Sequence, residues 1–374
     1  MSARAIPLAL RAPIAACAAL ALVSGVLAGL VRAGWGVPLP ASAIMAHGPL
    51  LAVGFFGTLI GLERAVAVGH LAALVPPVLA AASGVAMVLG APIAPVLATA
   101  SGLAALVLHG WLLARSPSLD LAMLTLGALA WALGNVAWLA GRTIADASLG
   151  WSAFLVLTIV GERLEMTRLL PPRRGRTATL AAAVALLVVG SASAVIEPGL
   201  GAWARGAGLA AMGLWLLAHD AVLRVRAPGT PPYLKTALAL GHPWLVIAAP
   251  LVVLAGGDLA GLRYDAALHA IYAGFVLGMV LAHAPIVLGA VLKVRLAPPP
   301  FLYVPLVLLH GATATRVAGD LLGEPSLRGL GALASALALV VFASTIVVSL
   351  LAHRRARAAD RDGLSLGAAT ERSP

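Results

Sequence analysis

Charged side chains are scarce in this chain of 374 residues, where they make up 10% of the composition against 61% for hydrophobic residues. Soluble domains are about a quarter charged, so this balance excludes a water-soluble globular domain as the leading interpretation. It also excludes a disordered chain, because disordered segments lack the apolar residues that are abundant here. A disulfide scaffold is excluded by the single cysteine, Cys17, which has no partner in the sequence.

The sequence also lacks the short motifs of several enzyme and cofactor classes. It contains no GxxxxGKS/T phosphate-binding loop, no CxxCH haem-attachment motif and no HExxH zinc motif. P-loop ATPases, covalent c-type haem proteins and zinc proteases of the HExxH type are therefore not indicated.

Long apolar runs, interrupted by Pro, Gly and charged residues, dominate the chain, and its mean hydropathy is +1.01. A helix needs about 20 apolar residues to cross the hydrocarbon of a bilayer. The sequence therefore predicts an all-α, polytopic membrane helix bundle. The twelve expected spans are residues 13–33, 43–63, 71–91, 94–114, 119–140, 149–169, 177–196, 203–223, 236–256, 265–291, 301–321 and 329–352.

Positive charge is distributed unevenly over the loops that join these spans. Of the 25 Lys and Arg residues, 19 fall on the side of the two termini, and six fall on the other side: Arg32, Arg142, Arg205, Arg263, Arg316 and Arg328. Cytoplasmic loops carry such an excess, so we expect both termini in the cytoplasm and the protein in a bacterial-type inner membrane. The expected domains are a transmembrane bundle over 1–353 and a polar cytoplasmic tail over 354–374. The net charge of +11 is thus explained without a nucleic-acid partner, and the expected partner is the lipid bilayer.

Histidines are the strongest candidates for function, because ionisable groups inside a bilayer are costly. His47 opens the second span and His269 opens the tenth, and both spans run inward, so the two side chains are expected at one level near the outer surface. Neutral imidazole is a common ligand of haem iron and copper. Asp265 lies one helical turn before His269 and is placed to orient its second ring nitrogen, although a plain surface role fits equally well.

A second group of histidines is expected in the inner half of the membrane. His283 and His310 are predicted at one level there, and His109 and His242 lie slightly nearer the cytoplasm. These four are candidate metal ligands, with copper as the candidate metal. The alternative for each is a hydrogen bond to a neighbouring helix, which is equally common in membrane bundles.

Two of the spans that run inward end in clusters of acidic and basic residues. The second span ends with Glu63 and Arg64, and the sixth ends with Glu162, Arg163 and Glu165. Opposite charges this close are expected to pair, which lowers the cost of partial burial. The clusters indicate either interfacial anchors or a cytoplasmic entry for protons, ions or an anionic group.

The second, sixth and tenth spans carry the richest polar content of the twelve. They are spaced four spans apart and all run inward. This spacing predicts three four-helix arcs around a pseudo-threefold axis.

Twelve spans with outer-level histidines on the second and tenth resemble subunit I of the haem–copper oxidases, in which helices 2 and 10 hold the low-spin haem. A closer similarity is to the NnrS family of twelve-span membrane proteins that contain haem and copper and are tied to nitric oxide stress. The segments MAHGPLLAVGFFGTLIG and LHAIYAGFVLGMVLAHAPIVLGAVLK, which carry His47, His269 and His283, are similar to the histidine-bearing helices of that family. The resemblance implies haem b held by His47 and His269, copper as a further cofactor, and a role in redox chemistry or in handling a gaseous ligand.

The sequence departs from the oxidase pattern in ways that oppose terminal oxidase activity. Oxidases carry an HxH pair on helix 10, whereas His269 and His283 are 14 residues apart. They carry adjacent histidines on helix 7 and a His–Tyr pair on helix 6, and both are missing here. Two other functions stay open: a secondary transporter or a metal or proton permease with a histidine-lined path, and a non-catalytic assembly factor or sensor.

Overall fold

The computed structural model describes residues 6–167, 174–194, 196–224, 232–292 and 300–370, with side chains described outside 287–292 and 353–370. These residues form helices joined by short loops, and they contain no strand. The elements, in which η1 and η4 are π-helices and η2 and η5 are 3₁₀-helices, are α1 (Leu8–Arg32), α2 (Ala41–Met45), α3 (His47–Pro49), η1 (Leu50–Gly57), α4 (Thr58–Val68), η2 (Leu71–Leu74), α5 (Val75–Val88), α6 (Ala94–Arg115), α7 (Leu119–Leu139), α8 (Ile144–Met166), α9 (Arg176–Ser193), α10 (Pro198–His219), α11 (Ala221–Arg224), α12 (Pro232–Gly241), α13 (Pro243–Ala255), α14 (Gly261–His269), η4 (Ala270–Leu277), α15 (Gly278–Leu292), η5 (Pro300–Leu302), α16 (Tyr303–Leu322) and α17 (Pro325–Thr370).

The prediction of an all-α bundle with twelve membrane-length spans is confirmed. Twelve helical stretches of the described chain are long and apolar enough to cross a membrane, and each overlaps one expected span. The largest differences at an end are five residues, as at 13 against Leu8 and at 149 against Ile144. The pseudo-threefold arrangement stays a prediction.

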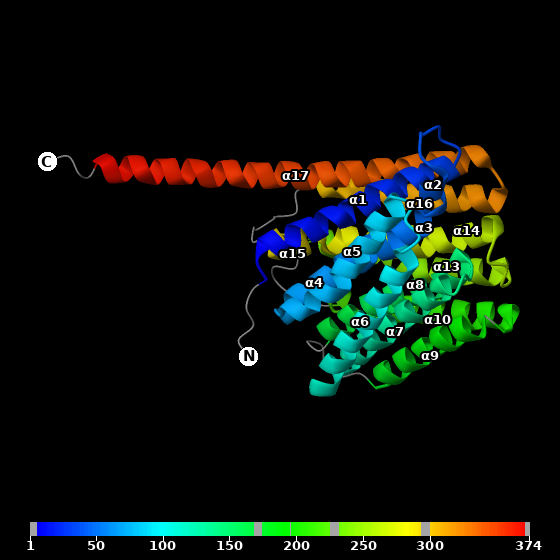
Figure 1. The fold of residues 1–374 in the computed structure, drawn as a ribbon. Coiled ribbons are helices and arrows are strands. Elements are labelled where there is room, and N and C mark those ends of the chain that lie inside the picture. Colours follow the sequence, from blue (N-terminus) through cyan, green and yellow to red (C-terminus); the bar gives the residue numbers. More distant parts are fainter. Residues whose placement is uncertain (1–5, 168–173, 195, 225–231, 293–299, 371–374) are drawn as a thin grey trace.

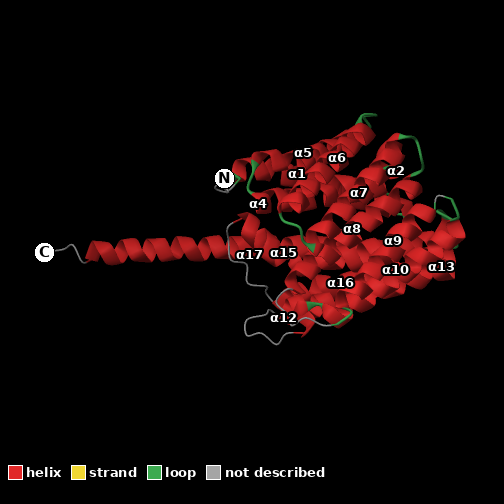
Figure 2. Ribbon diagram, turned by 90° about the horizontal axis from the view of Figure 1, so that it is seen from below, coloured by secondary structure: helices red, strands yellow, loops and turns green. Residues whose placement is uncertain are grey.

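Consecutive spans pack mainly as antiparallel neighbours, with α7 on α8, α9 on α10 and α16 on α17. Figure 1 shows α1 and α17 running side by side along one edge of the bundle, with α9 and α10 along the opposite edge. In Figure 2 α8 lies in the middle of the bundle, and its side chains are buried almost without a break from Ala147 to Leu164. The start of α1 and the end of α17 lie at the same end of the bundle, and α17 continues as a helix beyond it through Thr370.

Two spans share an unusual feature, a π-helical segment that directly follows a candidate histidine. The segment η1 begins three residues after His47, and η4 begins at the residue after His269. In each segment a glycine lies against a tryptophan of another helix: a Cβ added to Gly57 would be 2.4 Å from Trp131, and one added to Gly274 would be 2.4 Å from Trp244. Wide i→i+5 turns are rare and occur mostly at functional sites, so both features direct attention to the starts of these spans.

The crossing of α7 and α8 offers a direct test of this close packing. A Cβ added to Gly150 would be 2.4 Å from the Ala130 carbonyl oxygen, so we expect Gly150→Ala to lower the free energy of unfolding by about 1–3 kcal/mol through overpacking. Gly110→Ala on α6 is the matched control, because nothing lies within 4 Å of its added Cβ and alanine is the better helix former. Thermal unfolding of the purified protein in detergent measures both. A Gly150→Ala protein as stable as Gly110→Ala would contradict the packing.

Candidate cofactor site

A cavity of about 770 Å³ lies at the end of the bundle where the second and tenth spans begin. Both outer candidates, His47 and His269, line it, so the structure brings this pair of side chains to one space. Its walls come mainly from α1, α3, η1, α8, α14, η4, α16 and α17, and they are mostly apolar. We call it the outer cavity; its lining includes Leu22, Val26, Leu51, Phe55, Phe56, Trp151, Tyr264, Leu268, Tyr272, Leu277, Ala332 and Leu339.

The ring of His47 is held against α1 by two glycines. Its Nδ1 donates a hydrogen bond to the Gly25 carbonyl oxygen at 2.7 Å. A Cβ added to Gly29 would be 2.7 Å from the ring atom Cε1, so only glycine leaves room for the imidazole at this position. Because a carbonyl oxygen only accepts, Nδ1 carries the proton and the Nε2 of the neutral ring keeps its lone pair.

His269 has the same tautomer for the same reason. Its Nδ1 donates to the backbone carbonyl oxygen of Asp265 at 2.8 Å, and the Asp265 carboxylate oxygen Oδ1 lies 3.5 Å from the same nitrogen. Asp265 therefore does contact the second ring nitrogen, mainly through its backbone. Two imidazoles from different spans thus line the outer cavity, each with Nδ1 hydrogen-bonded and an Nε2 lone pair suited to a metal.

A four-residue ion network borders the outer cavity beside His269. Arg316 pairs with Asp265 and donates to Asp320 at 3.2 Å, while Arg328 donates to Asp320 at 2.6 Å and lies 3.4 Å from Asp265. The side chain of Asp320 is fully buried. Two acids and two bases compensate one another here, which lowers the cost of holding these charges within the span.

A metal ion fits this network poorly. Among the described residues, Asp265, His269 and Asp320 form the one group of three acidic or histidine ligands whose atoms lie within 4.8 Å of one another. Both carboxylates already accept hydrogen bonds from guanidinium groups, so a cation there would be repelled by Arg316 and Arg328. Within the part of the chain that the structure describes, the inner histidines belong to no such group.

His283 and His310 have different partners. The Nε2 of His283 accepts a hydrogen bond from Arg163 at 2.9 Å, and its Nδ1 donates to the Met279 carbonyl oxygen. The Nδ1 of His310 accepts from the indole N–H of Trp244 at 2.9 Å, and its Nε2 is buried without a hydrogen-bond partner in the described structure. These contacts favour the alternative of interhelical hydrogen bonding over metal ligation for both rings.

The other two inner candidates are also buried. His109 on α6 donates from Nδ1 to the Ala105 carbonyl oxygen at 2.8 Å and lies in the field of Arg64. His242, between α12 and α13, is completely buried, and neither of its ring nitrogens has a hydrogen-bond partner in the described structure. Neither ring lines the outer cavity.

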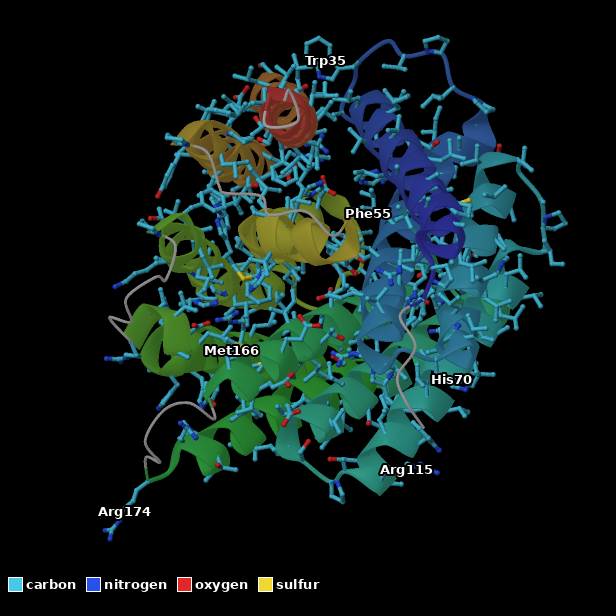
Figure 3. The ribbon with its side chains drawn as sticks, turned by 90° about the vertical axis from the view of Figure 1, so that its left-hand side faces the viewer. Trp35, Phe55, His70, Arg115, Met166 and Arg174 are labelled. Atoms are coloured by element: carbon cyan, nitrogen blue, oxygen red, sulfur yellow. The ribbon has the colours of Figure 1, made fainter. Side chains whose placement is uncertain are left out.

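The predicted charged ends of the second and sixth spans do lie together. Arg64 is 3.6 Å from Glu162 and joins the two spans, and the neighbouring Glu63 lies in the field of Glu162. Figure 3 looks onto this end of the bundle, which we call the charged end, and there His70, Arg115 and Met166 mark the ends of the second, fourth and sixth spans. The same view shows Phe55, a wall of the outer cavity, deeper inside beside the ribbon of α1.

Arg163 has a partner that the sequence did not indicate. It forms a bidentate pair with Asp220, at 2.8 and 3.0 Å, across 57 residues of sequence. Glu165, which was expected to share in the pairing at this end, forms no ion pair with Arg163 in the described structure. The signal for Asp220 was available, since it is the lone acid at the end of an apolar run, but its partner depends on which helices are neighbours.

Comparison with known proteins assigns the chain to one family. A family model described as a domain of unknown function (DUF8744) matches residues 11–351. No curated protein matches the chain. No solved structure matches it.

The ion network beside His269 predicts a large stability effect. Asp320→Asn removes the charge that faces Arg316 and Arg328, so we expect a loss of about 3–5 kcal/mol in the free energy of unfolding, as for a broken buried pair. Asp258→Asn is the control, because Asp258 is exposed and its replacement should change stability by less than about 0.5 kcal/mol. Thermal unfolding in detergent compares the two. Equal stability of the two variants would show that the network does not contribute to folding.

Proposed function

This chain belongs to the DUF8744 family, and we propose that it binds one haem b in the outer cavity, where His47 and His269 would hold it. The observation that carries the proposal is the matched state of the two rings. Both line one cavity, both use Nδ1 on a backbone carbonyl oxygen, and both keep Nε2 for a metal. Axial histidines of metal sites are oriented in this way by a partner on the second nitrogen.

The size and lining of the outer cavity support an apolar macrocycle. Its volume of about 770 Å³ falls among cofactor and ligand pockets, which range from about 300 to 1,000 Å³. Phe55, Phe56 and Trp151 supply aromatic walls, and leucines supply most of the remainder. Such a lining excludes water from the ring and leaves polar recognition to a few groups.

One unpaired arginine that lines the outer cavity matches a carboxylate of haem b. Arg32, Arg316 and Arg328 line the same space, and guanidinium groups bind carboxylates through paired hydrogen bonds. Arg32 is exposed and has no ion pair among the described residues, so it is the free cation of the three. We assign it to one carboxylate of the haem.

Haem held by two imidazoles supplies reversible one-electron chemistry when bound. His47 and His269 would hold the haem, and the bound group would supply electron-transfer chemistry. The pair of imidazoles gives less support to the handling of nitric oxide that the NnrS resemblance implies. Copper is not part of this proposal, because no copper-ligand set is supported by the inner histidines.

Localisation completes the proposal. By the arginine bias of the loops, the charged end and both termini face the cytoplasm, and the outer cavity faces the outer side of a bacterial-type inner membrane. A histidine-lined transport path receives less support, because His109, His242, His283 and His310 do not line the outer cavity.

Removing either axial ligand should abolish the haem signal. We expect the wild-type protein, expressed with haem available, to show a Soret band and about one iron per chain, and His47→Ala and His269→Ala to lose both because a single imidazole gives up half of the ligation. Absorption spectroscopy and elemental analysis measure this. His219→Ala is the control, since that ring lies at the end of α10 with its Nδ1 on the Trp215 carbonyl oxygen. A wild-type protein without iron, or folded variants that keep the Soret band, would refute the proposal.

A less disruptive change tests the orientation of His47. In Gly29→Ala the added Cβ would lie 2.7 Å from the His47 ring, so the ring must turn. We therefore expect the affinity of the apoprotein for haem to fall by about tenfold or more. Gly311→Ala on α16, with nothing within 4 Å of its Cβ, should leave haem retention unchanged. Titration of the purified apoprotein with haem measures both affinities. Equal affinities would mean that the contact with α1 does not position the ligand.

A further inference from the structure

A second polar cluster lies buried at the charged end, away from the outer cavity. It consists of Arg163 on α8, Asp220 between α10 and α11, His242 between α12 and α13, and His283 on α15. Arg163 is 4% exposed, and Asp220 and His242 are 0% exposed. Ionisable groups at such depth in a membrane bundle are expensive and mark functional paths more often than plain packing.

Both carboxylate oxygens of Asp220 accept hydrogen bonds from neighbouring donors. Its two oxygens accept from Nε and one terminal nitrogen of Arg163, and Oδ1 also accepts from the backbone N–H of Val222 at 2.9 Å. The other terminal nitrogen of Arg163 donates to Nε2 of His283, which fixes that ring as neutral with its proton on Nδ1. Arg163 and Asp220 therefore compensate one another, and the cluster carries no net charge.

His242 is the one member of the cluster whose hydrogen-bonding groups are unused. Neither ring nitrogen has a hydrogen-bond partner in the described structure, and the ring is completely buried. Its Nε2 lies 3.6 Å from Oδ2 of Asp220, a few tenths of an ångström beyond a hydrogen bond. A buried polar group without a partner costs free energy, and a charge-assisted bond to the carboxylate would recover it.

The groups that face His242 act in opposite directions on an added positive charge. The Asp220 carboxylate favours it and the Arg163 guanidinium opposes it, while His283 is a neutral ring. The face toward η4 is the apolar ring of Phe275. On the side of α16, His310 is a neutral ring held by Trp244. Glu162, next to Arg163 in the chain and partly exposed, brings a carboxylate to the solvent side of the cluster, where Arg64 pairs with it at 3.6 Å.

We propose that His242 and Asp220 together form a buried proton-binding site at the charged end. One proton from water forms an N–H bond on the His242 ring, and no electron moves. Asp220 stays ionised between the imidazolium and Arg163, so the net charge of the cluster changes from zero to plus one. The inference does not depend on haem in the outer cavity, because none of these residues lines that cavity.

The protonation state of His242 is measured by nitrogen-15 NMR of the full-length protein, labelled at histidine and reconstituted in lipid vesicles. Subtracting the spectrum of His242→Gln from that of the wild type isolates this ring. We expect it to change from neutral to imidazolium as the pH is lowered from about 8 to about 3. A ring that stays neutral over this range would overturn the proposal.

Two variants of Asp220 separate proton binding from a purely structural role. In Asp220→Asn the counter-charge is lost, and we expect the His242 ring to stay neutral over the same range, whereas Asp220→Glu keeps the charge and should keep the transition. Asp220→Asn leaves Arg163 unpaired and can fail to fold. In that case the other two variants test proton binding without it, since the transition should persist in Asp220→Glu and be lost in His242→Gln. His219→Gln, at the end of α10, should remove one resonance and leave the His242 transition intact. Loss of the transition in Asp220→Glu would contradict the pairing.

Discussion

The hydrogen bond from a histidine Nδ1 to a backbone carbonyl oxygen decides what the outer cavity can do. Water cannot satisfy polar groups inside a bilayer, so an imidazole placed there must find its partner in the protein. His47 finds it on α1 and His269 finds it one turn back on its own helix. Since the acceptor is a carbonyl oxygen in both cases, each ring is fixed in one tautomer, and the lone pair at Nε2 becomes the reactive feature of the site. The contrast with His310, whose Nδ1 is itself the acceptor, shows how one neighbouring group reverses the chemistry of the same side chain.

Glycine makes these arrangements sterically possible. The pair Gly25 and Gly29 on α1 has the spacing typical of close helix packing. Gly29 leaves room for the imidazole of His47, and Gly25 leaves room for the side chain of Leu51. The π-helical segments use the same principle, because Gly57 and Gly274 each lie against the ring of a tryptophan from another helix. Widened turns and missing side chains thus shape the walls beside both candidate ligands.

The fold was largely accessible from sequence, whereas the partners of each polar side chain were not. Length and apolarity of a run are local properties, and they located all twelve spans to within a few residues. The common height of His47 and His269 also followed from counting residues along antiparallel spans. Lateral contacts require knowledge of which helices are neighbours, and so the pairing of Arg163 with Asp220, 57 residues away, and of Arg316 with Asp265, 51 residues away, was missed. The π-helical segments carry no clear sequence signal beyond Pro49, which precedes only one of them.

Placement of charge divides the molecule into two ends with different chemistry. At the outer cavity the acids Asp265 and Asp320 are matched by two arginines, and the exposed Arg32 remains without an ion-pair partner among the described residues, so that end favours an added anion. At the charged end the charges of Asp220 and Arg163 compensate one another, and the ring nitrogens of His242 have no hydrogen-bond partner in the described structure. By our proposal, that end accepts a proton. In the low dielectric between them, a change of charge at one end is weakly screened and is felt at the other. If both proposals hold, an electron accepted near one face and a proton accepted near the opposite face would leave the net charge of the interior unchanged, so occupation of either site would favour occupation of the other.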